Sequence, residues 1–302
     1  MAINQTQKLI WLVNTILNAK KIDLKGINDH WQDEMFLNDG SELPRRTFNN
    51  WKDKIFDMFG LEIKCDSSYQ YYISNADDLK ENSMAKWLLD TYSISNSLSG
   101  CTAIKDRIIL ENIPSGKKYL NLVIEAMKKN QRISIKYHNY WRDDIRDHDL
   151  MPLCVKLFHQ RWYMVGRENG MDKSFCLDRI HEFSLSDETF EYPADFSPED
   201  YFSNCIGIIN NQDIEPEDIE LWVSSEEANY IRDLPLHESQ KEIERNDDYS
   251  LFTIRVRPTY DFYQEILTFG DQVEIQKPED VREKMKLKAI NMANKYKQQH
   301  NK

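Results

Sequence analysis

The chain has 302 residues, of which 40% are hydrophobic and 30% are charged, and this length suits two or three domains better than one core. Its formal net charge of −12 argues against a protein that coats nucleic acid without specificity, although it allows a basic surface on one element. No apolar run approaches the roughly 20 residues that cross a bilayer, the N-terminal segment lacks signal-peptide features, and the five cysteines form no CxxC pair, so we expect a cytoplasmic protein without a cofactor or metal.

Residues 1–75 predict three helices followed by a β-hairpin. The first helix has an apolar stripe, Asp23 can cap the second, and the third begins near Pro44 and ends at Gly60. LEIKCDSSYQYYI then alternates like two short strands joined by a turn at Asp66-Ser67-Ser68. Three helices and a hairpin predict a winged helix-turn-helix DNA-binding domain.

The third predicted helix, within PRRTFNNWKDK, carries residue types that read DNA. Arginine pairs with guanine edges and asparagine with adenine, while lysine and threonine anchor phosphates. The N-terminal end of this helix enters the major groove in this fold. With two residues of the hairpin, the predicted DNA-binding set is Arg45, Arg46, Thr47, Asn49, Asn50, Lys52, Lys64 and Tyr69. The alternative is a solvated basic helix end in a helical protein–protein module.

The rest of the chain predicts two further folded units and two connections. We expect a helical linker over 76–116 with buried Trp87, Leu88, Ile108 and Leu110. Residues 117–195 predict a helix and short strands that form a small barrel, with HDLMPLCVKLF and KSFCLDRIHEFSL each as one strand. A linker over 196–216 then leads to residues 217–302, whose β-α-β-β-α-β order fits a ferredoxin-like unit. The expected fold class is therefore α+β multidomain.

Two segments of the middle unit form a known pattern. RWYMVG at 161–166 and FCLDRI at 175–180 resemble the W-Y-L and F-x-L-D-R-I signature of the WYL-domain family of bacterial transcriptional regulators. LPRRTFNNWKDKI is similar to that family's recognition helix, and the C-terminal unit resembles the extension that often follows the WYL domain. The resemblance covers nearly the whole chain in the expected order.

This resemblance implies a five-stranded Sm-like barrel related to SH3 folds. It also implies a homodimer that binds double-stranded operator DNA and senses a nucleic-acid fragment or a nucleotide-like anion. The chain departs from the pattern at Met164, which replaces leucine, and at Cys176 and Asn50, which replace basic residues. The loss of an arginine at 176 removes a planar fork for phosphate, and the change at 50 prevents transfer of an operator sequence.

Alternation along the two signature segments predicts which side chains face a ligand. Trp162 and Met164 should share one face, Tyr163 and Val165 the other, and Phe175 and Leu177 should be core. Arginine and lysine donors beside an aromatic ring are the usual chemistry for short single strands. The predicted ligand-binding set is His159, Arg161, Tyr163, Lys173, Ser174 and Arg179. A packed tyrosine, an Asp178–Arg179 ion pair and a turn histidine are the structural alternatives.

We therefore expect a ligand-controlled DNA-binding transcription factor and not an enzyme. No Ser-His-Asp order, phosphate loop or metal-ligand spacing supports catalysis. Two alternatives remain at this stage. One is an adaptor that uses the winged helix for protein contact, and the other is a metal-dependent nuclease built on DDIRDHD at 143–149, in a predicted hairpin loop.

Overall fold

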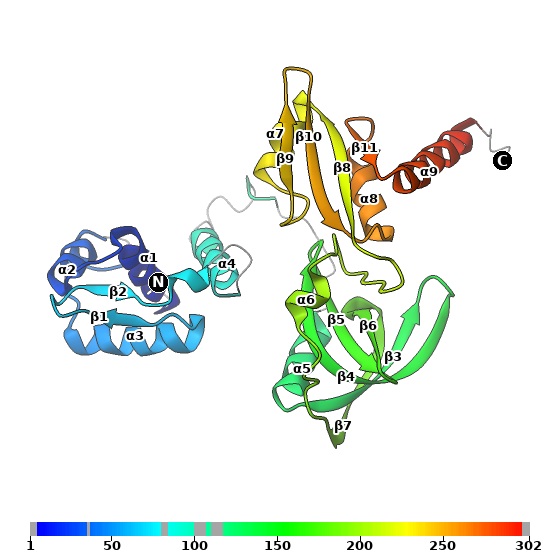
Figure 1. The fold of residues 1–302 in the computed structure, drawn as a ribbon. Helices are drawn as coiled ribbons and strands as arrows, with labels where there is room; N and C mark the ends of the chain where they lie inside the picture. The colour runs from blue at the N-terminus through cyan, green and yellow to red at the C-terminus, as the bar shows by residue number, and fades with distance from the viewer. Residues whose placement is uncertain (1–4, 35–36, 80–83, 100–106, 110–116, 298–302) are drawn as a thin grey trace. The chain divides into compact units, whose positions relative to one another are not determined.

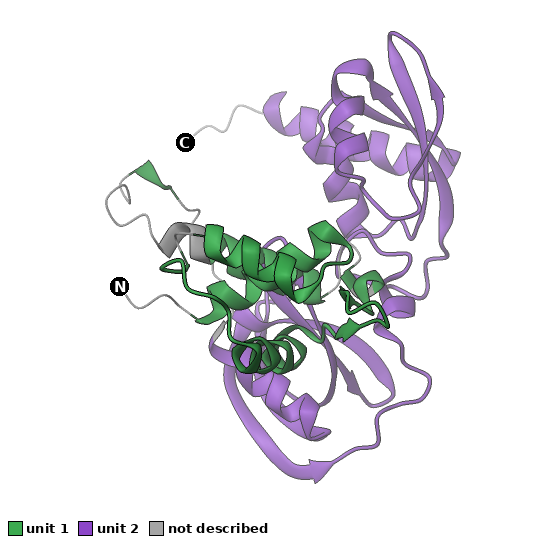
Figure 2. Ribbon diagram, turned by 90° about the vertical axis from the view of Figure 1, so that its left-hand side faces the viewer, with its two compact units in different colours: residues 1–111 green, residues 112–302 purple. Residues whose placement is uncertain are grey.

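The structure is a computed structural model that describes residues 5–34, 37–79, 84–99, 107–109 and 117–297 (Figure 1). The chain divides into two compact units, Met1–Glu111 and Asn112–Lys302 (Figure 2). Among these residues, no helix is both long enough and apolar enough to cross a membrane.

The first unit contains the predicted three helices and hairpin. Its elements are α1 Gln5–Ala19, α2 Leu24–Asp33, α3 Arg45–Phe59, β1 Ile63–Cys65, β2 Tyr71–Ile73, the 3-10 helix η1 Ala76–Leu79 and α4 Met84–Ser99. The Asp23 carboxylate accepts a hydrogen bond of 2.7 Å from the amide of Gly26 and caps α2 as predicted. Gly60 ends α3 with a φ of 67°, a conformation that glycine adopts without strain.

One apolar core holds these helices and the hairpin together. Phe48, Ile55 and Leu12 are fully buried in it. The prediction that Trp87 is buried is wrong, because 44% of its surface is exposed and Leu89, two positions along α4, is buried instead. Leu88 packs partly buried against the core, Ile108 is half-buried, and the predicted burial of Leu110 lies outside the described residues.

The second unit begins with a helix on a five-stranded antiparallel sheet. Its elements are α5 Lys117–Lys128, β3 Gln131–Asn139, β4 Asp144–Phe158, β5 Arg161–Glu168, β6 Met171–Cys176, the 3-10 helix η3 Leu177–Arg179 and β7 Ile180–Thr189. The strand order is β6-β5-β4-β3-β7, so the first strand lies between the second and the last. KSFCLDRIHEFSL was predicted as one strand, but η3 divides it, which lets β7 leave β6 and pair with β3.

Each face of this sheet is covered by a different element. Met164 and Phe175 are cross-strand partners that pack with Val123 of α5 in one core. Val165 packs on the other side with Phe196 and Tyr201. Those two residues lie in or just before α6 Pro198–Phe202, so this part of the chain is packed onto the sheet.

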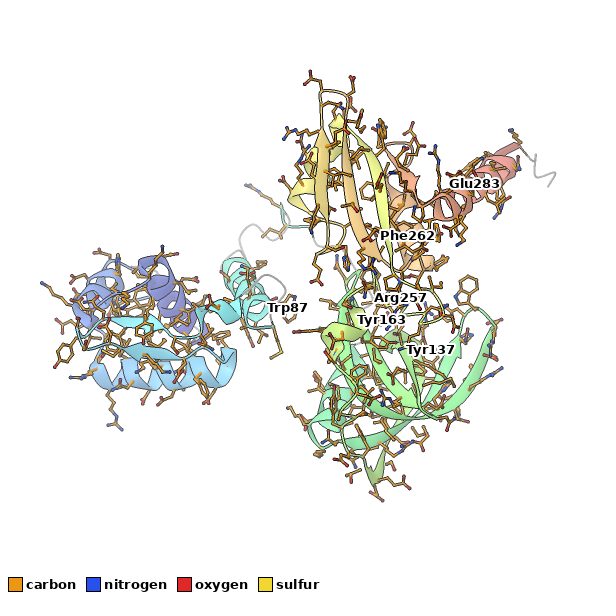
Figure 3. The ribbon with its side chains drawn as sticks, in the orientation of Figure 1. Trp87, Tyr137, Tyr163, Arg257, Phe262 and Glu283 are labelled. Carbon is orange, nitrogen blue, oxygen red and sulfur yellow. The ribbon has the colours of Figure 1, made fainter. Side chains whose placement is uncertain are left out.

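The C-terminal part of the second unit has the predicted β-α-β-β-α-β order. It consists of β8 Glu217–Ser224, α7 Ser225–Asp233, β9 Lys241–Arg245, β10 Tyr249–Val256, α8 Tyr260–Thr268, β11 Val273–Lys277 and α9 Glu279–Lys297. The antiparallel strand order is β11-β8-β10-β9, and Phe262 of α8 is fully buried against the sheet (Figures 1 and 3). The long α9 extends away from this sheet toward the C-terminus (Figure 1).

Residues 205–209, which we call the connecting segment, are held from both sides. Lys156 of β4 donates a hydrogen bond of 2.8 Å to the carbonyl of Gly207, and Ser174 of β6 donates one of 2.8 Å to that of Ile208. From the other side, the Asp261 carboxylate of α8 accepts hydrogen bonds from the amides of Ile208 and Ile209. A Cβ at Gly207 would clash with the Asp261 side chain, so only glycine allows this approach.

Candidate DNA-binding and effector sites

Helix α3 exposes a polar face opposite its buried face. Arg45, Arg46, Asn49 and Asn50 are exposed, while Phe48 on the other side is fully buried. Thr47 and Lys52 are half-buried. The helical period therefore presents the first turns of α3 to solvent with guanidinium and amide groups that can reach a base edge or a phosphate.

The two predicted hairpin residues differ in their surroundings. Tyr69 is 79% exposed and lies in the turn between β1 and β2 with a φ of 61°. The Lys64 ammonium lies 2.8 Å from the Glu62 carboxylate, whose hydrogen bond raises the pKa of Lys64. Tyr69 is therefore open to a partner, whereas the Lys64 ammonium already has a carboxylate partner in Glu62.

Three of the six predicted ligand residues converge at one end of the five-stranded sheet. The Arg161 Nε atom lies 3.6 Å from the Oδ2 atom of Asp178. The Arg179 guanidinium lies 4.4 Å from the centre of the Tyr140 ring, and its Nε atom is buried with no hydrogen bond to any described residue. Arg161, Arg179 and the Asp178 carboxylate together thus carry a net positive charge.

Tyr163 is the aromatic member of this group (Figure 3). Burial raises the pKa of its hydroxyl to about 12, against the opposing effect of Arg179 and Arg161. Its cross-strand partner Cys176 is buried, and the Cys176 amide donates a hydrogen bond of 3.2 Å to the hydroxyl of Tyr137. Tyr163 therefore forms a half-buried wall beside the two arginines and does not present an open ring face.

The other three predicted ligand residues have partners elsewhere. Ser174 bonds to the connecting segment, and the Lys173 ammonium lies 2.8 Å from the Glu168 carboxylate. His159 lies in the turn between β4 and β5, where its Nε2 atom is 3.8 Å from the Glu265 carboxylate of α8. The structure does not bring these three side chains to the Arg161–Arg179 group.

His159 lines a cleft of about 540 Å³ between the β4–β5 turn and helices α7 and α8. Most of the lining is apolar, and its carboxylates come from Glu227, Asp233 and Glu265. Three carboxylates beside one histidine repel an anionic ligand. The charge of this cleft therefore disfavours an anionic ligand, whereas the charge of the arginine site favours one.

The acidic stretch 143–149 was predicted to lie in a hairpin loop, but only Asp143 lies in the turn. The turn covers residues 140–143, and β4 starts at Asp144. Asp143 lies 2.9 Å from His138, and Asp149 lies 3.1 Å from Arg132. Alternation along β4 sends neighbouring side chains to opposite faces. Among the residues that the structure describes, no group of three or more His, Cys, Asp and Glu side chains could hold a metal ion.

The sequence prediction missed three aromatic residues close to the arginine site. Tyr140 and Trp141 occupy the turn between β3 and β4, and Tyr260 begins α8. The sequence HNYWRDD could have indicated Tyr140 and Trp141, because two large aromatic residues are unusual in a polar turn. The neighbourhood of Tyr260 depends on the packing of α8, which no local pattern reveals.

Two family models match the second unit. Residues 118–185, from α5 into β7, match the WYL domain, and residues 215–293, from before β8 into α9, match the WCX domain. The chain is a WYL-domain protein with a C-terminal WCX domain. The connecting segment falls between the two matched regions, so its hydrogen bonds with Ser174, which donates, and with Asp261, which accepts, join the WYL domain to the WCX domain.

Two solved structures are also similar to this WYL-domain protein. Proteasome accessory factor B/C (PafBC) of Arthrobacter aurescens is 17% identical, with a TM-score of 0.36, and the match covers 92% of this chain and 45% of that chain. This chain thus spans less than half the length of PafBC. A CRISPR Cas-related protein is 13% identical, with a TM-score of 0.40, and the match covers 98% of this chain and 87% of that chain. Neither TM-score reaches 0.5, and no curated protein matches the chain.

Proposed function

We propose that this protein is a ligand-responsive bacterial transcriptional regulator. It binds operator DNA through α3 and the β1–β2 hairpin, acting as a winged helix-turn-helix, and senses a nucleic-acid fragment or nucleotide-like anion at its WYL domain. One observation carries the proposal: the first turns of α3 expose Arg45, Arg46, Asn49 and Asn50 in a chain that also contains a WYL domain. These residue types contact bases and phosphates from a groove-binding helix.

The effector half of the proposal rests on the charge of the Arg161–Arg179 group. Arginine binds phosphate through a planar fork, and a buried donor without a partner gains a full hydrogen bond when an anion arrives. Arg179 supplies such a donor at Nε, and Arg161 lies close enough to Asp178 to exchange that carboxylate for a phosphate. We retain Arg161, Tyr163 and Arg179 as the effector residues and assign His159, Lys173 and Ser174 to their observed partners.

A homodimer completes the proposal, because two-fold operators are read by two copies of a groove-binding helix. Helix α9 supports this proposal with exposed apolar side chains at Leu287, Ile290 and Met292. Leu287 and Ile290 are three residues apart and therefore share one face of the helix. An adaptor without DNA binding has no comparable need for the exposed Arg and Asn set on α3.

A DNA-binding assay tests this function directly. Fluorescence anisotropy with a duplex from the promoter of the protein's own gene should give specific binding that weakens steeply as salt rises. Addition of a short single-stranded oligonucleotide should change the operator affinity of the wild type and leave that of Arg179→Ala unchanged. The absence of specific, salt-sensitive binding at low salt would leave the adaptor as the better function.

A further inference from the structure

Three exposed aromatic side chains lead away from the arginine site, beginning with Tyr140, whose ring carries the Arg179 guanidinium. The exposed fractions are 58% for Tyr140, 82% for Trp141 and 47% for Tyr260. Single exposed apolar residues are common on proteins, but here Trp141 and Tyr260 are in ring contact and Tyr140 directly precedes Trp141 in the chain. Tyr140 and Trp141 are chain neighbours, with Cα atoms about 3.8 Å apart, and Trp141 contacts Tyr260 across the two domains.

The geometry of the rings leaves stacking faces open. Trp141 and Tyr260 meet at right angles, with centroids 5.7 Å apart and an interplanar angle of 85°. In an edge-to-face pair one ring uses only its edge and the other only one face, so each ring keeps a face that its partner does not cover. The exposure of both side chains agrees with this arrangement.

The charges around the rings select the class of ligand. Tyr140 carries the Arg179 guanidinium on its face, and Arg142, next to Trp141, is exposed. On the acidic side, Asp143 lies beside His138, and Asp261 accepts amides of the connecting segment. An open aromatic surface beside Arg179, whose buried Nε atom has no hydrogen bond to a described residue, suits bases joined by phosphates better than an apolar peptide or a lipid tail.

We propose that Tyr140, Trp141 and Tyr260 form a base-stacking platform for a short single-stranded nucleic acid whose phosphates bind Arg179 and Arg161. This inference rests on the proposed function. It identifies the side chains that contact the bases of the effector, whereas the arginines contact its phosphates. Bases stack on aromatic rings with little dependence on sequence, so the platform accepts mixed sequences. Because Trp141 belongs to the WYL domain and Tyr260 to the WCX domain, the bound strand touches both.

An abasic probe separates base stacking from phosphate binding. We would measure the anisotropy of a labelled single-stranded DNA of about eight nucleotides and of a sugar-phosphate strand of the same length without bases. The variants are Trp141→Ala, Tyr260→Ala and the conservative Trp141→Phe, all in the 302-residue chain. Tyr230→Ala is the matched control, because Tyr230 is 71% exposed on α7 and lines the acidic cleft.

Loss of either ring should weaken binding of the base-containing strand by about 5-fold to 150-fold and leave binding of the abasic strand unchanged. Trp141→Phe and Tyr230→Ala should bind like the wild type, and Arg179→Ala should weaken binding of both strands. If Trp141→Ala and Tyr260→Ala bind like the wild type while Arg179→Ala does not, the platform is wrong and the proposed function stands. Equal weakening for both strands would also overturn the platform, and a wild type that binds neither strand would overturn the proposed effector class together with it.

Discussion

The Ser174 hydroxyl donates a hydrogen bond of 2.8 Å to the carbonyl oxygen of Ile208, and this bond fastens the connecting segment to the WYL sheet. Lys156 makes the neighbouring bond to Gly207 and lies with its ammonium 4.1 Å from the centre of the Phe202 ring. Burial lowers the pKa of this ammonium, so the segment covers a side chain that would otherwise be hydrated. The WYL and WCX domains are thus joined by a packed segment and not by a loose linker.

Ser174→Ala tests this role of the hydroxyl. The substitution leaves the half-buried Ile208 carbonyl without its donor and should lower the free energy of unfolding by about 1 kcal/mol. The affinity for the single-stranded oligonucleotide should stay unchanged, because the hydroxyl points to the segment. Urea unfolding and anisotropy measure the two quantities. Ser184→Ala, at an exposed position of β7, is the control. Unchanged stability with lost oligonucleotide binding would return Ser174 to the effector site.

Local alternation predicted the faces of β5 correctly because a strand has a period of two. Met164 lies in the core under α5, and Tyr163 and Val165 lie on the opposite face. The same rule predicted Phe175 and Leu177 as core, and both are buried, but it did not predict that η3 interrupts the strand at Leu177. A 3-10 turn of three residues has no hydrophobic period of its own that a sequence pattern could reveal.

Long-range packing accounts for the other differences. Residues 196–216 have few periodic apolar residues, yet Phe196, Tyr201 and Cys205 are buried. The contact of Trp141 with Tyr260 joins positions more than one hundred residues apart, and only the packing of α8 brings them together. The helix order, the hairpin and the β-α-β-β-α-β order were predictable because caps, turns and periodic apolar residues are local signals.

Arg179→Ala should abolish the effect of an oligonucleotide on operator affinity while the protein stays folded. The buried Nε atom has no partner among the described residues, so its removal costs the free protein no hydrogen bond there, whereas the complex loses about 2 kcal/mol. Anisotropy titration measures the affinity, and a thermal melt reports the fold. Arg146→Ala removes the same charge from an exposed position on β4 and serves as the control. A lost thermal transition in Arg179→Ala would make this arginine structural.

Arg46→Ala and Asn50→Ala should weaken operator binding in different ways. A phosphate contact through Arg46 predicts weaker binding to all duplexes and a slope of log affinity against log salt that falls by about 1. A base contact through Asn50 predicts a loss of about 1–3 kcal/mol for the operator alone. Titrations against operator and random duplex at several salt concentrations separate the two. Lys241→Ala, on exposed β9, controls for the change in net charge. Wild-type binding by both variants would show that α3 does not read the DNA.

The Arg232–Glu242 pair predicts an acid-sensitive WCX domain. Hydrogen bonds of 2.9 Å and 2.7 Å join the two side chains, and they lower the pKa of Glu242 from 4.5 to about 2. The folded pKa lies below the unfolded one, so the stabilisation is present above pH 4.5 and is lost as the pH falls toward 2.

Between pH 5 and pH 2.5, Glu242→Gln should therefore lose about 1–2 kcal/mol less stability than the wild type, a range reduced for the 26% exposure of the carboxylate. Urea unfolding at a series of pH values measures the difference. Glu215→Gln, at an exposed position before β8, should follow the wild type. Parallel curves for the wild type and Glu242→Gln would mean that the pair does not contribute to the acid response.

The apolar face of α9 predicts where two copies meet. Leu287 is 58% exposed and Ile290 is 47% exposed, and a charge on this face would be buried without a partner in a dimer. The double substitution Leu287→Asp and Ile290→Asp should convert a dimer to a monomer, as measured by light scattering after size exclusion. The monomer should still show a cooperative thermal transition, because the substituted side chains are exposed. Asn291→Asp adds a charge at an exposed position of the same helix and should leave the dimer intact. A double variant that remains dimeric would place the interface on another element, and a monomeric wild type would remove the dimer from the proposed mechanism.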